Sequence, residues 1–284
     1  MELTGARILL TGASGGLGQA LARALAEAGA DLFLLGRDAE RLAALVQDLA
    51  GTGARLHCLA VDLNQPGTVE QVAEAARLFG INVLVNNAGI NAFGLYAEQD
   101  WRQAEAVLAT NLLVPMALVR ALLPWLSRQP AAAILNVGST FGSLPFPGFA
   151  AYSAAKAGLR GFSQALRREL ADSRVEVVYV APRAIRTPLN SAAVNALNRE
   201  LGSKEDSPAL AARRIVAALA AGRAETHLGF PEALFARLNG ALPRLIDRAL
   251  AGKLPSIRRH AGADRPLPAE PLSQPLTQPA RSLP

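Results

Sequence analysis

The sequence predicts an α/β fold: a single domain in which a doubly wound parallel sheet is covered by helices on both faces. Short apolar runs alternate with helix-length segments along the chain, and several of these runs are apolar throughout. A strand without polar alternation is buried on both faces, which is typical of parallel sheets. At 284 residues, the chain is long enough for one large domain with a sizeable core.

Six short runs are predicted to be the strands of this sheet. They span 6–10, 31–35, 54–61, 82–86, 131–137 and 174–180. Helix-length segments such as 17–29 and 38–51 lie between them, and both of these end in a glycine, which is typical of a helix C-cap. In such a sheet the ligand crevice lies at the carboxyl ends of the strands, so we expect the chemistry there.

The pattern of strands and helices stops near Pro255. Residues 254–284 carry seven prolines and show no apolar periodicity. We therefore expect a folded domain over 1–254, followed by a Pro-rich, disordered or polyproline-like tail over 255–284.

The composition excludes several classes of site. A single cysteine, Cys58, excludes an intrachain disulfide framework and a cysteine-cluster metal centre, and the three histidines are too far apart for a metal-ligand spacing. We expect no metal, and a reducing, cytoplasmic location, since no signal-peptide pattern follows Met1. The formal charge is +6, but the basic residues are scattered among acids, which argues against nucleic-acid binding.

Two apolar segments raise the question of membrane or subunit contacts. The uncharged run that starts at Ala106 has 14 residues, fewer than the roughly 20 that span a bilayer, and suits a buried helix or a subunit contact. Residues 227–253 place Leu and Phe in a broken helical pattern opposite Arg. This segment could wall an apolar pocket, pack against a subunit or lie on a membrane surface, and we favour core or pocket packing over peripheral membrane contact.

The stretch "TGASGGLG", residues 11–18, follows the first strand and opens a predicted helix. Glycine permits a tight turn there, and its missing Cβ lets phosphate oxygens approach the backbone N–H groups at the helix start. The order of strand, glycines and helix indicates a Rossmann-type dinucleotide site.

The end of the second strand bears on which dinucleotide binds. An NAD(H) enzyme is expected to place an acid there for the ribose 2′-hydroxyl, but this strand runs into Gly36 and Arg37, with Asp38 at a predicted helix N-cap. Arg37 could cradle a 2′-phosphate or be a solvated residue at a helix start. The sequence favours NADP(H) over NAD(H).

Tyr152 and Lys156 lie four residues apart in "AAYSAAKAG". On spacing alone, they share one face of a helix and need have no chemical role. Lysine is rare in this chain: only three of the 29 basic residues are lysines, so its placement beside a tyrosine draws attention to the pair.

Six motifs occur in a fixed order: "TGASGGLG", "VD" at 61–62, "NNAG" at 86–89, Asn111, Ser139 and "YSAAK" at 152–156. Together they resemble the classical short-chain dehydrogenase/reductase (SDR) family over roughly residues 4–250. The resemblance implies an oxidoreductase that acts on small-molecule carbonyl or alcohol substrates. It also implies a homo-oligomer, dimer or tetramer, that pairs helices within 101–124 and 152–171.

The resemblance assigns catalytic roles to four residues. Tyr152 would exchange its phenolic proton with the substrate oxygen, and Lys156 would lower the phenol's ordinary pKa of about 10. Ser139 would hydrogen-bond the substrate oxygen and orient it. Asn111 would lie in a helix and hold a water that relays protons to Lys156.

The resemblance also assigns coenzyme contacts. The phosphate turn would comprise Gly12, Ser14, Gly16, Leu17 and Gly18, and Asp62 and Leu63 would flank the adenine. Asn87, Ala88, Gly89 and Lys156 would lie along the ribose, and Ile185 and Thr187 would contact the carboxamide. Tyr152 and Pro182 would be further coenzyme contacts. For Asn86, a ligand contact and a purely structural role in the sheet both remain open.

The match departs from the family at "PRAIRT", residues 182–187, where Arg183 stands in place of the usual glycine. An arginine there must adopt a costly positive φ, or the backbone must change shape. We expect Arg183 and Arg186 to face solvent, with contact to a phosphorylated or carboxylated substrate as the alternative. Gly15 also stands where many NADP-preferring relatives carry a basic residue, so Arg37 is the main support for NADP(H). Residues 187–209 would form a substrate lid.

The expected function is that of an NADP(H)-dependent oxidoreductase that transfers a hydride between nicotinamide and a carbonyl or secondary alcohol, with an apolar or acyl-chain-like substrate. An NAD-linked alcohol dehydrogenase and a non-catalytic, dinucleotide-sensing regulator are the alternatives. The intact Ser139, Tyr152 and Lys156 argue against the regulator, because a sensor has no use for a tuned phenol.

Overall fold

Seven parallel strands form the central sheet of the computed structural model, which describes residues 1–263. The spatial order is β3-β2-β1-β4-β5-β6-β7. The strands are β1 (Arg7–Leu10), β2 (Asp31–Gly36), β3 (Leu56–Ala60), β4 (Val83–Asn86), β5 (Ala132–Val137), β6 (Val175–Ala181) and β7 (Glu225–His227). The first six confirm the predicted strands. β7 was not predicted, because its three residues, Glu-Thr-His, carry no apolar signal.

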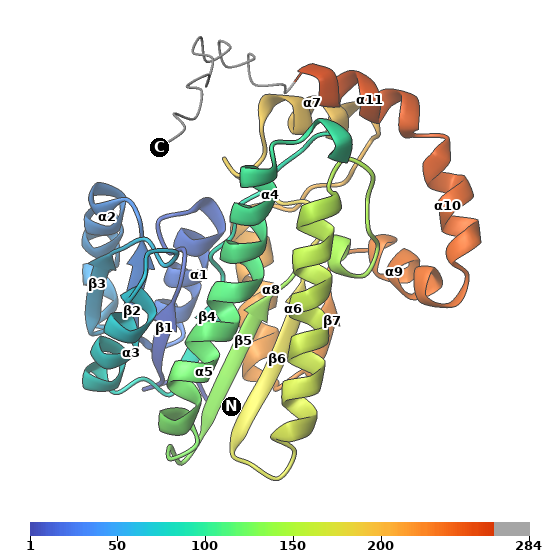
Figure 1. Cartoon of the computed structure of the whole chain (residues 1–284). Helices are drawn as coiled ribbons and strands as arrows, with labels where there is room; N and C mark the ends of the chain where they lie inside the picture. The colour runs from blue at the N-terminus through green and yellow to red at the C-terminus, as the bar shows by residue number, and fades with distance from the viewer. Residues whose placement is uncertain (264–284) are drawn as a thin grey trace, which may run out of the picture.

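Helices cover both faces of this sheet (Figure 1), which confirms the doubly wound α/β fold. They are α1 (Gly16–Glu27), α2 (Ala39–Leu49), α3 (Thr68–Phe79), α4 (Trp101–Leu108), α5 (Val114–Leu126), α6 (Ala150–Glu169), α7 (Ala192–Glu200), α8 (Pro208–Ala220), α9 (Glu232–Ala241), α10 (Pro243–Ala251) and α11 (Leu254–Ala263). Helices α1 and α8 pack on one face, while α3, α5 and α6 pack on the other.

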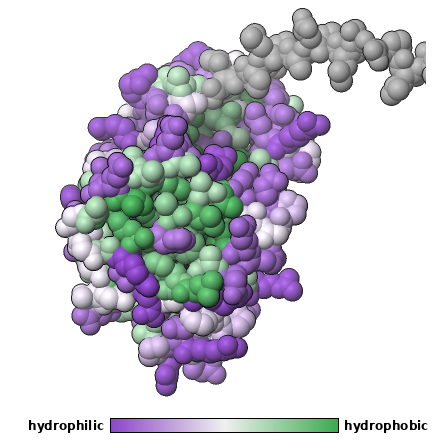
Figure 2. Space-filling view, turned by 90° about the vertical axis from the view of Figure 1, so that its left-hand side faces the viewer, coloured by the Kyte–Doolittle hydropathy of each residue, from purple (hydrophilic) through white to green (hydrophobic). Residues whose placement is uncertain are grey.

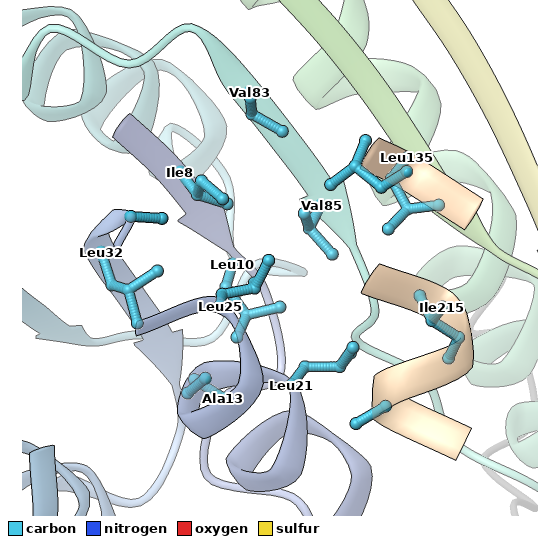
Figure 3. Packing of buried hydrophobic residues seen from close by; sticks show 14 of the residues in the cluster. Ile8, Leu10, Ala13, Leu21, Leu25, Leu32, Val83, Val85, Leu135 and Ile215 are labelled. Atoms are coloured by element: carbon cyan, nitrogen blue, oxygen red, sulfur yellow. The ribbon is translucent and has the colours of Figure 1, made fainter. Parts of the chain in front are cut away.

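Strand β1 shows why the predicted strands are apolar throughout. Ile8 and Leu10 belong to the hydrophobic cluster on the α1 and α8 side, whereas Leu9 belongs to the cluster on the opposite side. Figure 3 shows Leu21 of α1 and Ile215 of α8 within the first cluster. Truncating one such buried leucine to alanine typically lowers the free energy of unfolding by about 2–5 kcal/mol. Because β1 has buried leucines on both faces, the packing on each face stabilises the sheet.

The strand order places a crevice at the carboxyl ends of the central strands. β1 pairs with β2 on one side and with β4 on the other, so the chain leaves the β3 edge and returns next to β1. Loops that follow β1 and β4 therefore diverge at their carboxyl ends, which is where parallel α/β sheets bind ligands.

The apolar run from Ala106 lies within a longer helix than the sequence indicated. α4, a π-helical turn at Ala109–Leu113 and α5 form one continuous helix over Trp101–Leu126. By length and composition this helix could cross a membrane, but one of its sides, including Leu118 and Leu122, packs into the core against the sheet. Leu113 on the π-helical turn remains exposed.

The predicted boundary at residue 254 is wrong. Residues 254–263 form α11, which lies beside α7 at the top of the molecule in Figure 1. Ile257 and Ala261, one helical turn apart, are buried. Glu200 at the end of α7 forms an ion pair with Arg259 and a hydrogen bond with His260. The folded domain therefore extends to residue 263, and the rest of the predicted tail, 264–284, lies outside the described residues.

The favoured interpretation of residues 227–253 is also wrong for most of the segment. α9 and α10 pack against each other and reach out from the body of the molecule in Figure 1. Ala236 and Ile246 are the buried residues of these two helices, whereas Leu234, Phe235, Leu242 and Leu245 are exposed. Packing in the core or in a pocket thus accounts for only a minority of the apolar residues.

Figure 2 shows the side of the molecule that carries α2, β3 and α3 at the left of Figure 1. Hydrophobic surface gathers in the middle of this side, within a hydrophilic surround. β3 is an edge strand of the sheet, and its residues His57, Cys58 and Ala60 are exposed. Cys58 is thus a free surface thiol.

Candidate active site

The glycine-rich turn after β1 is shaped by close backbone contacts. Gly12 has φ +67°, and a Cβ there would lie 2.7 Å from the Cα of Ala88. A Cβ on Gly18 would lie only 2.0 Å from the carbonyl oxygen of Gly12. No larger residue fits either position, and the turn leads directly into α1, which begins at Gly16. The start of a helix next to a bare backbone is suited to a phosphate group.

A cleft of about 380 Å³ opens from this turn along the carboxyl ends of the strands. It is lined by every predicted coenzyme contact: Gly12, Ser14, Gly16, Leu17, Gly18, Arg37, Asp62, Leu63, Asn87, Ala88, Gly89, Pro182, Ile185 and Thr187. Ser139, Tyr152 and Lys156 line the same cleft. These residues fit a nicotinamide dinucleotide. Glycines whose positions leave no room for a Cβ line one part of the cleft, where phosphate groups can approach the backbone, and the hydroxyls of Ser139 and Tyr152 line another part.

Thr11 holds the ends of β1 and β4 together at the base of the cleft. Its hydroxyl oxygen accepts hydrogen bonds from the backbone N–H groups of Asn87 at 3.0 Å and Ala88 at 2.9 Å. The side-chain amide of Asn87 donates to the carbonyl oxygen of Thr11 at 3.0 Å. The motif "TGASGGLG" includes Thr11, but its glycines drew the functional assignment and this positioning role was missed.

Asn86 has the structural role that the sequence left open. Its amide donates to Oδ1 of Asn136 on β5 at 2.8 Å, and the Asn136 amide donates to the hydroxyl of Ser163 on α6 at 2.8 Å. All three side chains are buried. This chain of hydrogen bonds ties the sheet to the helix that carries Tyr152 and Lys156.

Asn111 lies behind the wall of the cleft rather than in it. It is fully buried in the π-helical turn, where its Oδ1 accepts from the backbone N–H of Ile90 at 3.0 Å and its Nδ2 donates to the Ile90 carbonyl at 2.8 Å. A Cβ on Gly89 would come within 2.7 Å of Asn111 Oδ1. Asn111 therefore fixes the loop after β4, and its water-relay role stays a prediction.

Helix α6 presents Tyr152 and Lys156 to the cleft one turn apart, opposite Ser139 at the end of β5. Lys156 is only 4% exposed, and its Nζ donates to the carbonyl oxygen of Val137 at 3.0 Å. The same Nζ lies 5.8 Å from the centroid of the Tyr152 ring. The ammonium, the phenol and the serine hydroxyl thus form one group at the substrate end of the site.

The expectation that Lys156 lowers the pKa of Tyr152 is not met in this structure. Burial raises the pKa of the Tyr152 phenol above its ordinary value, and a hydrogen bond with the Ser139 side chain opposes that rise. Burial also lowers the pKa of Lys156 to about 8. Burial is the largest cause of both shifts, and the Lys156 ammonium donates to the Val137 carbonyl.

Two arginines flank the cleft at the end of β2. Arg37 is exposed and lines the cleft together with Arg41, which the sequence reasoning missed. The carboxylate of Asp38 caps α2 by accepting from the Arg41 N–H at 3.0 Å, and it pairs with the Arg41 guanidinium at 3.1 Å. Arg41 could have been found from its position four residues after Arg37 at a predicted helix start, because residues at this spacing lie close together on a helix.

The expectation that Arg183 faces solvent is wrong. Its side chain is 15% exposed and pairs with the buried carboxylate of Asp206 at 2.6 Å and with Glu232 at 3.6 Å. No non-glycine residue among the described ones has a positive φ, so the backbone has changed shape instead of bearing strain. Arg186 is 75% exposed on its side chain, as expected. Arg183 thus anchors the predicted lid, whose residues Leu189 and Val194 line the cleft.

The fold and the cleft together define a dinucleotide-dependent oxidoreductase. Residues 6–198 match the family described as short chain dehydrogenase. The chain therefore belongs to the short-chain dehydrogenase/reductase family, as the sequence motifs predicted, and it is an enzyme of that family.

Individual relatives agree with this assignment. The 3-oxoacyl-[acyl-carrier-protein] reductase of Bos taurus is 37% identical over 68% of this chain and 79% of its own length. A short-chain dehydrogenase/reductase from Burkholderia phymatum, solved in complex with NAD, superposes with a TM-score of 0.77 at 26% identity, covering 86% of this chain and 96% of that one.

A second solved structure carries the other coenzyme. The short-chain dehydrogenase from Sphingobium yanoikuyae, solved in complex with NADPH, superposes with a TM-score of 0.73 at 28% identity, covering 85% of this chain and 95% of that one. Similar proteins thus hold either NAD or NADPH, and a nicotinamide coenzyme is common to both.

Proposed function

We propose that this protein is an NADP(H)-dependent enzyme that interconverts an apolar carbonyl compound and the corresponding secondary alcohol. The observation that carries the proposal is a single cleft lined both by the glycine turn and by Ser139, Tyr152 and Lys156. A regulator that only binds dinucleotide would need the first part of this cleft and not the second.

The chemistry that a bound nicotinamide coenzyme supplies is a hydride for the carbonyl carbon. The protein's own residues handle the oxygen. The Ser139 hydroxyl donates a hydrogen bond that orients the carbonyl, and the Tyr152 hydroxyl donates the proton that completes the alcohol. The Tyr152 phenol, whose pKa burial raises, carries the proton that the reduction consumes. Lys156, held by Val137, supplies the positive charge that stabilises the phenolate left behind.

Replacing Tyr152 with phenylalanine tests the reaction. We expect Tyr152→Phe to lower kcat/KM for carbonyl reduction by about 10²- to 10⁴-fold, the usual contribution of a positioned acid, while the Kd for NADPH stays within about twofold. Tyr96→Phe, an exposed tyrosine outside the cleft lining, is the matched control and should change neither value. Turnover that survives in Tyr152→Phe would contradict the proposed role.

The proposed preference for NADP(H) rests on charge at the end of β2. Arg37 and Arg41 both line the cleft there, and Asp38, the acid closest in sequence, is engaged by Arg41 and by the N-terminus of α2. A 2′-phosphate would meet two guanidinium groups, whereas a 2′-hydroxyl would find no free carboxylate among these three residues. Guanidinium groups suit phosphate because of their forked donors.

Coenzyme titration of the purified protein tests this preference. We expect wild type to bind NADPH more tightly than NADH, and Arg37→Asp to weaken NADPH by about 10- to 100-fold, the range of one charge-assisted hydrogen bond, with NADH unchanged or tighter. Arg128→Asp, at an exposed arginine outside the cleft lining, is the control for net charge. Equal or tighter NADH binding by wild type would favour the NAD-linked alcohol dehydrogenase instead.

We propose an apolar substrate because apolar side chains line the cleft, among them Ile90 and, on the predicted lid, Leu189 and Val194. The similarity to a 3-oxoacyl-[acyl-carrier-protein] reductase supports an acyl-chain-like compound as one candidate. We also propose a homo-oligomer that pairs through the outer side of the helix over Trp101–Leu126, where Trp101, Leu113 and Met116 are exposed.

A further inference from the structure

We propose that Phe141 and Phe149 form a wall that selects carbonyl substrates bearing a flat aryl group next to the carbonyl carbon. This inference rests on the proposed function, because it concerns the substrate of the same cleft. Both phenylalanines line the cleft with Tyr152. Phe141 and Phe149 played no part in the sequence analysis, since neither belongs to a motif.

Phe141 is fixed relative to the hydroxyls that would hold the substrate oxygen. It lies in the 3₁₀ turn Thr140–Gly142 directly after Ser139, and its backbone N–H donates to Ser139 Oγ at 3.2 Å. Its ring meets the Tyr152 ring edge-to-face, with centroids 6.4 Å apart and an interplanar angle of 87°. A carbonyl that accepts hydrogen bonds from both hydroxyls therefore has a substituent beside Phe141.

Two further aromatic rings pack against Phe141. Phe146 stacks on it with centroids 5.2 Å apart and an interplanar angle of 9°, and Phe149 lies 5.1 Å away at 49°. Phe93 packs on Phe149 at 4.9 Å. Aromatic pairs prefer stacked and edge-to-face arrangements, so an aryl substituent would extend a cluster that already has this geometry.

Residue Ile257 of α11 lies next to Gly148, the residue that precedes Phe149. Gly148 has φ +84°, and a Cβ there would lie 2.6 Å from Cε2 of Phe93 and 3.3 Å from Cγ2 of Ile257. Ile257 is fully buried, and the backbone N–H of Gly94 donates to the Gly148 carbonyl at 3.0 Å. The rings are thus packed from several chain segments, and a preorganised wall loses little conformational freedom when a ligand binds.

One charge in the cleft, the Lys156 ammonium, lies beside Tyr152 and donates to the Val137 carbonyl, whereas the arginines lie elsewhere or are paired. Arg37 and Arg41 stand at the end of β2, and Arg183 is paired with Asp206. A neutral, rigid ring gains from stacking and loses less rotamer freedom than a flexible acyl chain of similar area. These observations favour an aryl group over an anionic or long-chain substituent.

Two ketones matched in size test this inference. Acetophenone and cyclohexyl methyl ketone differ mainly in the aromaticity of the ring beside the carbonyl. We expect wild type to favour acetophenone by about 3- to 10-fold in kcat/KM, the range of one aromatic pair. Phe141→Leu should reduce this preference below about twofold. Phe230→Leu, the same change at an exposed ring outside the cleft lining, should keep it.

Calorimetric titration of the protein with 1-phenylethanol and 1-cyclohexylethanol gives a second readout that needs no turnover, and the same ratios are expected in Kd. Equal or reversed preferences in wild type, or an aryl preference that persists in Phe141→Leu, would overturn the inference and leave the proposed function intact. Absence of carbonyl turnover in wild type, or turnover that survives Tyr152→Phe, would instead contradict the proposed function, while the Kd ratios still decide the inference.

Discussion

Lys156 is needed for charge yet buried where charge is costly. In an unfolded chain a lysine has a pKa of about 10.4, whereas burial lowers that of folded Lys156 to about 8. Between these values the unfolded chain binds a proton that the folded protein has released, so stability rises with pH across this window. Below pH 8 both states are protonated, and the folded protein carries the full desolvation cost.

Removing the Lys156 amine should therefore abolish activity and make the folded protein more stable. We expect Lys156→Met to abolish turnover and to raise the free energy of unfolding at pH 7 by about 1–3 kcal/mol, the desolvation cost less one hydrogen bond to Val137. Urea unfolding at pH 7 and pH 9.5 measures this, and the gain should shrink at the higher pH. A variant less stable than wild type at pH 7 would show that the hydrogen bond and the packing of Lys156 outweigh its desolvation.

At the scale of single residues, the sequence predicted which residues line the site better than it predicted their burial and their partners. Ser139, Tyr152 and Lys156 follow from motif spacing, and the structure brings them together. The partner of Arg183 could not be foreseen, because Asp206 lies 23 residues away and is buried only once the lid folds. The direction of the Tyr152 pKa shift was missed for the same reason: desolvation depends on neighbours that spacing does not reveal.

At the scale of elements, strands with a strong apolar signal were predictable to within about two residues at each end, and elements without one were not. β7 is three polar or weakly apolar residues held as an edge strand by β6. The second residue of α11 is a proline, and only Ile257 and Ala261 on one side of the helix are buried. Its sequence therefore resembles the proline-rich stretch that follows. Tertiary contacts with α7 stabilise α11 where local propensity does not.

For the whole molecule, the long helix over Trp101–Leu126 leaves an apolar outer side that a single copy does not cover. The side chain of Leu113 is on the π-helical turn of this helix, and the residue is 57% exposed. Burying it against a second copy would contribute hydrophobic free energy, and a carboxylate there would have to be desolvated without a partner. The proposed oligomer should therefore be sensitive to charge at this position.

Sedimentation velocity tests this expectation. We expect wild type to sediment as a dimer or tetramer at about 10 µM and Leu113→Glu to weaken association by at least about 100-fold, giving monomers. Leu78→Glu on α3, where the native leucine is 81% exposed, introduces the same charge as a control and should leave the assembly unchanged. A monomeric wild type, or an unchanged mass in Leu113→Glu, would contradict this proposed interface.

The contacts of α11 determine where the chain can be shortened. A truncation at the predicted boundary would end at Leu254 and remove Ile257 from beside Gly148, along with the partners of Glu200 on α7. Such a protein would keep its glycine turn and its tyrosine, yet lose the support of its aromatic wall and of the helix at its predicted lid. Any shortened version made for crystallisation or screening needs to retain residues 254–263, or its substrate profile will describe a different pocket.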